Sequence, residues 1–111
     1  MSRDYRVYSE DIIEAIERIR EYTTGLSFDN FVNDRKTIDA VNRNLAIIGE
    51  AANRIPEEIK AKYPDIEWYN IVGLRNILVH DYFRVDLEII WDIIENKLSL
   101  FEKQVKKILH D

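Results

Sequence analysis

The sequence predicts an all-α fold, an up-and-down bundle of about four to five helices forming a single domain over residues 1–111. The first observation is that apolar residues recur every three or four positions along nearly the whole chain, which is the spacing of one helix face. The second is that no stretch alternates with period two and that no Asn-Gly or Asp-Gly turn occurs. The third is the small number of residues that interrupt helices, three Gly and two Pro.

The first helix is predicted to cover about 20 residues that include Tyr5 to Tyr22. Its apolar stripe consists of Tyr5, Tyr8, Ile12, Ala15, Ile16, Ile19 and Tyr22. Gly25 follows at a position where a helix end favours a left-handed residue. Ser27 then opens a short turn that carries Phe28, Phe31 and Val32.

A second long helix is predicted to begin at Asp34, whose side chain can cap it. Its stripe consists of Ile38, Val41, Leu45, Ile48, Ala52 and Ile55. Small residues, among them Gly49, make one section of this helix thin, so we expect a neighbouring helix to approach closely there. Pro56 and Pro64 then bracket a segment of at most two turns.

A third helix is predicted from about Ile66 to roughly Val79, followed by a break over residues 80–85. Asp86 then starts a last long helix. Its stripe consists of Leu87, Ile90, Trp91, Ile94, Leu98, Phe101, Val105 and Ile108. Together the stripes carry more aromatic surface than a small bundle easily hides, which favours a homodimer, although large aromatic side chains also fill cores well.

Composition excludes several classes of site. The chain has no Cys and only two His, so disulfides, thiolate nucleophiles, iron–sulfur clusters and His-rich metal centres are not expected, and neither is a cofactor. The net charge of −5 means that any contact with nucleic acid must rest on a local patch. No signal peptide and no membrane-spanning run are present, so we expect a cytoplasmic protein without a membrane partner.

The chemically rich segment is residues 73–83, which places a guanidinium, an amide, an imidazole and a phenol in a few positions: Arg75, Asn76, His80 and Tyr82. Arg75 and His80 are five residues apart, about 140° around a helix, and do not share a face of a straight helix. A helix that ended near Val79 would let a turn swing His80 and Tyr82 toward Arg75. Alternatively, two copies could build a composite site across a dimer axis. Asn76 and His80, four residues apart, share a face if the helix continues.

The spacing alone also fits an ordinary structural role, because Arg and His in the last turn of a helix commonly bond its free carbonyls. Two groups of cations can in principle contact phosphates, but a place on a helix surface is the more ordinary role for each. These groups are Arg35, Lys36 and Arg43, and Lys103, Lys106 and Lys107.

Two stretches, Asp39–Arg54 and Asp65–Asp86 followed by Leu87–Trp91, resemble the HepT-like ribonuclease toxins of the HEPN superfamily. Such bacterial and archaeal proteins are encoded beside a MntA-type nucleotidyltransferase antitoxin, in type VII toxin–antitoxin systems. The resemblance implies a dimeric helical bundle whose two Arg-x4-His-x-Tyr motifs meet in a cleft at the interface. It also implies cleavage of RNA (mRNA or tRNA), and not DNA, without a metal ion.

The same resemblance implies roles for single residues. Arg75 and His80 are the expected catalytic pair, with Asn76 in support, and Tyr82 is the residue that the antitoxin would modify with AMP. Imidazole suits proton transfer near neutral pH, and guanidinium suits the charge that builds on a phosphorane. A different class of function is a non-catalytic helical subunit that presents substrate to a nucleotidyltransferase; such a scaffold would not need the intact Arg75, His80 and Tyr82 set.

Overall fold

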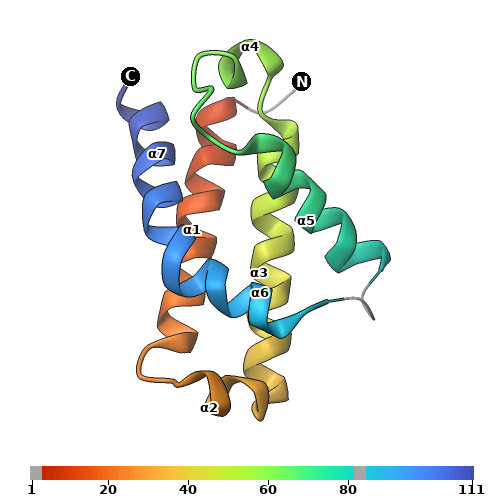
Figure 1. The fold of residues 1–111 in the computed structure, drawn as a ribbon. Helices are drawn as coiled ribbons and strands as arrows, with labels where there is room; N and C mark the ends of the chain where they lie inside the picture. Colours follow the sequence, from red (N-terminus) through yellow and green to blue (C-terminus); the bar gives the residue numbers. More distant parts are fainter. Residues whose placement is uncertain (1–3, 82–84) are drawn as a thin grey trace.

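The all-α prediction is confirmed in the computed structural model, which describes residues 4–81 and 85–111 and contains helices and no strand within them (Figure 1). The elements in chain order are α1 (Tyr5–Thr23), α2 (Phe28–Val32), α3 (Arg35–Arg54), α4 (Glu57–Lys60), α5 (Trp68–His80), α6 (Leu87–Asp92), the π-helical turn η2 (Ile93–Lys97) and α7 (Leu98–His110).

The helices begin where the sequence places side-chain caps. Ser27 forms a capping box with Asn30 at the start of α2, and Asp86 accepts a hydrogen bond from the Glu88 backbone N–H at the start of α6. Asp34 caps α3 by accepting hydrogen bonds from the hydroxyl and the backbone N–H of Thr37. These bonds, that of the hydroxyl more than that of the N–H, hold the pKa of Asp34 below its ordinary value. These caps satisfy backbone donors that each first turn leaves unpaired.

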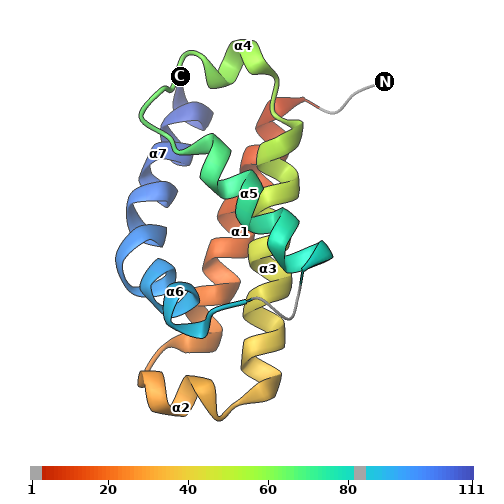
Figure 2. The same cartoon turned by 45° about the vertical axis from the view of Figure 1, so that its right-hand side comes forward.

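The long helices α1, α3 and α7 run side by side, whereas α5 crosses α3 obliquely and its C-terminal end projects from the bundle (Figures 1 and 2). The core lies between α1, α3 and α7. Its fully buried side chains include Ile12, Ile16, Ile19, Phe31, Val41, Ala52, Ile90, Val105 and Ile108. The up-and-down description therefore fits three helices but not α5, of which only Leu78 is buried.

The last helix differs from the prediction, because the single long helix after Asp86 is divided by η2. In a regular α-helix Ile90 and Leu98, eight residues apart, would lie about 80° apart around the axis. A π-turn takes up roughly one extra residue and so brings both to the same side. Both side chains are buried, and Trp91 of α6 packs its ring against Phe31 with centroids 5.2 Å apart.

The start of α5 is held to the end of α7. The Tyr63 hydroxyl donates to Asp111 Oδ2 at 2.6 Å, and this hydrogen bond is the main reason that the pKa of Tyr63 rises to about 12. Trp68 Nε1 donates to the Tyr63 carbonyl, and Gln104 Nε2 of α7 donates to the Asp65 carbonyl. Among the described residues, no helix is both long and apolar enough to cross a bilayer.

Candidate active site on helices α3 and α5

Arg75 lies where α5 packs tightly against Gly49 of α3. A Cβ atom built on Gly49 of α3 would lie only 2.2 Å from Arg75 Cβ and 3.0 Å from the Ile71 carbonyl oxygen. A side chain at position 49 would therefore push α5 away, and only glycine allows this approach. The prediction that a neighbour packs closely against the thin section of this helix is confirmed.

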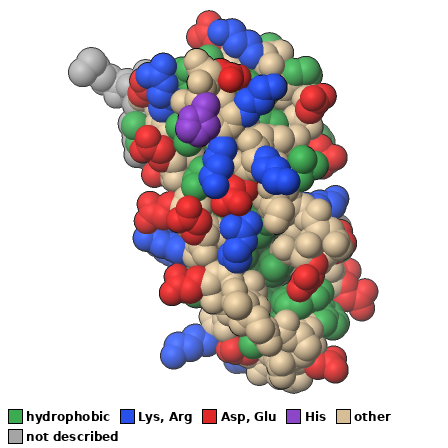
Figure 3. Space-filling view, turned by 90° about the vertical axis from the view of Figure 1, so that its left-hand side faces the viewer, with side chains coloured by type: hydrophobic (Ala, Val, Ile, Leu, Met, Phe, Trp, Pro, Cys, Tyr) green, Lys and Arg blue, Asp and Glu red, His purple; other side chains and the backbone are tan. Residues whose placement is uncertain are grey.

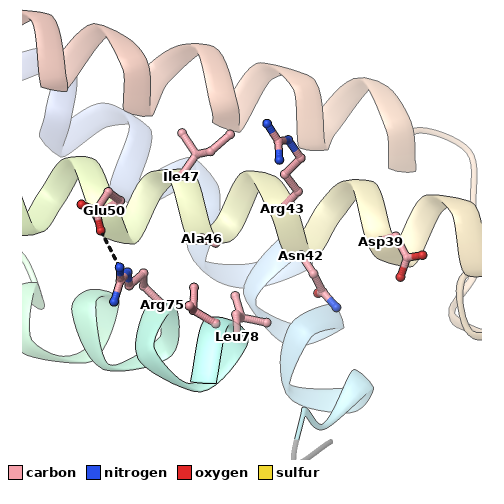
Figure 4. A pocket seen from close by; sticks show the side chains of 9 residues that line it. Asp39, Asn42, Arg43, Ala46, Ile47, Glu50, Arg75 and Leu78 are labelled. Atoms are coloured by element: carbon pink, nitrogen blue, oxygen red, sulfur yellow. Dashed lines mark ion pairs between the residues drawn. The ribbon is translucent and has the colours of Figure 1, made fainter. Parts of the chain in front are cut away.

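The guanidinium of Arg75 is held from two sides. Its Nη2 lies 2.9 Å from Glu50 Oε2 (Figure 4), and its Nη1 donates to Asn76 Oδ1 at 2.9 Å. Glu50 also accepts a hydrogen bond from Arg54 Nε on its other oxygen, so the carboxylate is itself fixed. The Arg75 side chain remains 27% exposed, which leaves part of an oriented cation open to an anionic ligand.

A groove with a volume of about 610 Å³ runs between α3 and α5, with Arg75 on its lining (Figure 4). Its lining residues are Asp39, Asn42, Arg43, Ala46, Ile47 and Glu50 from α3, and Arg75, Leu78 and Val79 from α5. Neither Asn76 nor His80 lines it. Arg75 therefore lies at the border between this groove and the outer face of α5.

His80 is the last residue of α5 and is exposed, without a hydrogen bond or ion pair to any other described residue. The helix ends at His80, one residue past the predicted Val79, and the Asp81 N–H donates to the Ile77 carbonyl at 2.9 Å. His80 therefore still lies in the last helical turn, so no turn before it brings the imidazole back toward Arg75. Tyr82 lies outside the described residues.

Arg75 and His80 do not share a face within one chain, since α5 is continuous between them and separates them by about 140°. Asn76 connects the two sides. It receives the Arg75 hydrogen bond and lies one turn before His80, and both residues are exposed. The guanidinium thus reaches the edge of the face that carries the imidazole.

That face of α5 has no covering element within the described part of the chain. It carries Tyr69, Gly73, Asn76, Ile77 and His80, which recur at spacings of three or four. Tyr69 is 89% exposed and Ile77 43%, and a Cβ atom on Gly73 would meet nothing within 4 Å. We call these five residues the open face of α5.

Other cations do not form a uniformly basic surface. On the α7 side of the molecule Lys and Arg side chains are interspersed with Asp and Glu (Figure 3). Lys106 of this region pairs with Glu102 at 3.8 Å. No cluster of three or more His, Cys, Asp or Glu side chains suited to a metal ion occurs in residues 4–81 and 85–111.

Sequence reasoning missed Glu50 and Asn42 as parts of this region. The signal for Glu50 was its position beside Gly49, at the place predicted for close approach, together with an Arg four residues later. Asn42 gives a weaker signal, because a polar residue beside the apolar stripe of a helix is common at its margin.

Comparison with known proteins assigns the chain to a family. The family described as "Ribonuclease HepT-like" matches residues 12–108. "Putative RNase MJ0127" of Methanocaldococcus jannaschii is 40% identical over 109 residues, which cover 98% of this chain and 90% of that protein. "Probable ribonuclease HepT" of Thermococcus cleftensis is 39% identical over 108 residues, 97% of this chain and 98% of that protein. No solved structure matches the chain.

Proposed function

The chain belongs to the HepT-like ribonuclease family, and on that premise we propose that it is a metal-independent endoribonuclease toxin of a type VII toxin–antitoxin system. Its substrate is cytoplasmic mRNA or tRNA, and its partner is a MntA-type nucleotidyltransferase. The observation that carries the proposal is Arg75, a partly exposed guanidinium that Glu50 and Asn76 orient; Asn76 lies one turn before His80, which bonds to no other described residue. Purified protein is expected to cut RNA in the presence of EDTA, and His80→Ala protein is not.

The two catalytic groups have different tasks. His80 exchanges the protons, taking one from the ribose 2′-hydroxyl or giving one to the leaving 5′-oxygen. Arg75 stays charged and donates hydrogen bonds to the phosphorane as negative charge builds on it. Glu50 and Asn76 keep the guanidinium in one orientation, which reduces the cost of ordering it in the transition state.

A homodimer through the open face of α5 completes the site. Because Arg75 and His80 point in different directions from α5, one chain cannot place both side chains on the same phosphate. Exposed Tyr69 and Ile77 supply the apolar contact, and Gly73 lets two α5 helices cross closely because no atom of the described residues lies within 4 Å of a Cβ built there. The imidazole of each chain then lies near the guanidinium edge of the other.

We expect Ile77→Asp to convert the dimer to a monomer and to abolish cleavage, because a charge buried at the crossing of two α5 helices has no partner. Sedimentation at several protein concentrations measures the first effect and cleavage of labelled RNA the second. Leu100→Asp is the matched control, since Leu100 is an exposed apolar residue of α7. A dimer that persists in Ile77→Asp would contradict the use of this face.

Tyr82, two residues after His80 in the sequence, is the proposed site of AMP addition by the antitoxin; the added bulk and negative charge would repel RNA. Co-expression with the nucleotidyltransferase is expected to raise the mass of the wild-type chain by one or more AMP units. Tyr82→Phe should show no increase and should remain toxic. Tyr69→Phe is the control, since Tyr69 is the exposed tyrosine of α5; loss of modification there instead would contradict the assignment.

A further inference from the structure

We propose that the groove between α3 and α5 binds a ribonucleotide next to the phosphodiester that is cut, and that Asn42 recognises its base. The inference rests on the proposed ribonuclease function and deepens it, because it names the part of the chain that selects the cleavage sequence. Arg75 is one of the residues that line the groove. When its guanidinium holds the phosphate that is cut, the nucleoside on one side of that phosphate therefore lies at the groove.

The lining and the volume of the groove suit a nucleotide base. Ala46 and Ile47 of α3 and Leu78 and Val79 of α5 give the lining four apolar side chains, which suit the flat face of a base. Its volume of about 610 Å³ leaves room for a base with its sugar. Charged groups lie on the same lining (Figure 4), which favours an orientation with the base inside and the phosphates at the groove mouth.

Asn42 is a buried groove residue with a polar atom that the described fold leaves without a partner. Its side chain lines the groove and is 6% exposed, yet its Oδ1 has no hydrogen-bond partner within the described residues. A buried polar atom without a partner lowers stability, so an apolar side chain would serve the fold better here. An amide offers both a donor and an acceptor, the combination that pairs with the edge of a base.

Arg43 supplies a second cation on the same lining. It is exposed and makes no ion pair with another described residue, whereas the Arg75 guanidinium is already held by Glu50. Two guanidinium groups on one groove can contact successive phosphates of a single strand. Asp39 also lines the groove, and a carboxylate there favours a base over a phosphate in its neighbourhood.

The test measures binding and does not depend on cleavage. Short labelled homopolymers of A, C, G and U are titrated into His80→Ala protein, and fluorescence anisotropy gives four dissociation constants. We expect these to differ between bases, and Asn42→Ser in the same background to reduce the difference by about tenfold. Asn42→Leu is the second variant, because it removes the amide and keeps the volume.

Asn44→Ser is the matched control. Asn44 is also buried with an unpartnered Oδ1, but its Nδ2 donates to the Ala40 carbonyl and the residue does not line the groove. An equal spread of affinities in Asn42→Ser and in its parent would overturn the inference, as would a change of oligomeric state without a change in base preference. Base-selective binding by a wild-type protein that cuts no RNA would instead contradict only the proposed ribonuclease function.

Discussion

Replacement of His80 by Ala is expected to lower the rate of RNA cleavage at least about a hundredfold, because a positioned proton-transfer group contributes at least that much to such reactions. The fold should be unaffected, since His80 is exposed at the end of α5 and no other described residue bonds to its side chain. Cleavage of labelled tRNA and mRNA by purified protein in EDTA measures the rate, and circular dichroism checks the fold. In cells, the wild-type protein is expected to arrest growth, and the same substitution should relieve that arrest.

His110→Ala is the matched control for this experiment. His110 is the other histidine of the chain, and it is also exposed in the last turn of a helix. Its substitution should leave cleavage unchanged. If wild type and His80→Ala are equally inactive on RNA and equally harmless in cells, the enzyme assignment of His80 is wrong, and a non-catalytic subunit of a nucleotidyltransferase becomes the better interpretation.

The arrangement of Arg75 and His80 has a consequence for activation. Because a continuous α5 keeps the two groups about 140° apart, a single chain holds an oriented cation, and an imidazole to which no other described residue bonds, without bringing them together. Formation of the dimer would then assemble the site and create activity in one step. A dilute monomer would be inactive even with both residues intact.

Local features of the fold were predictable from the sequence because they depend on neighbouring residues. Asp34 caps the helix it was expected to cap, and Ser27 and Asp86 cap segments that begin where the sequence predicted a turn and a helix. Gly25 adopts a φ of +83° just after α1. The start of α5 was predicted slightly early, at about Ile66. There the Trp68 N–H donates to the Ile66 carbonyl in a turn, and the helix begins at Trp68.

Features that depend on contacts between distant segments were not predictable in the same way. The apolar pattern after Asp86 fits a continuous helix. The π-turn becomes evident only from the structure, in which Ile90 and Leu98 are both buried in the core on either side of it. The pairing of Glu50 with Arg75 requires the crossing of α5 over α3. For the site, the types of residue were recognisable from the motif, but their orientation depends on that crossing.

Gly49→Ala is expected to destabilise the protein and to remove most of its activity, although alanine favours a helix over glycine by about 1 kcal/mol. The added Cβ would lie 2.2 Å from Arg75 Cβ, so α5 must shift away from α3. Such overpacking typically costs about 1–3 kcal/mol, which outweighs the gain in helix propensity. The shift would also move the Arg75 guanidinium away from Glu50. Thermal unfolding and the cleavage rate measure the two effects.

Gly73→Ala separates this clash from the general effect of replacing a glycine in a helix. No atom lies within 4 Å of a Cβ at Gly73, so in a monomer the substitution should stabilise α5 by about 0.5–1 kcal/mol. In a dimer whose α5 helices cross at Gly73, the same methyl group would weaken association. Measuring the dimer fraction of Gly73→Ala and of Gly49→Ala on dilution would reveal this effect. A Gly49→Ala protein as stable and as active as wild type would mean that α5 does not rest on α3 at Arg75. The guanidinium would then lack the support on which its proposed catalytic role depends.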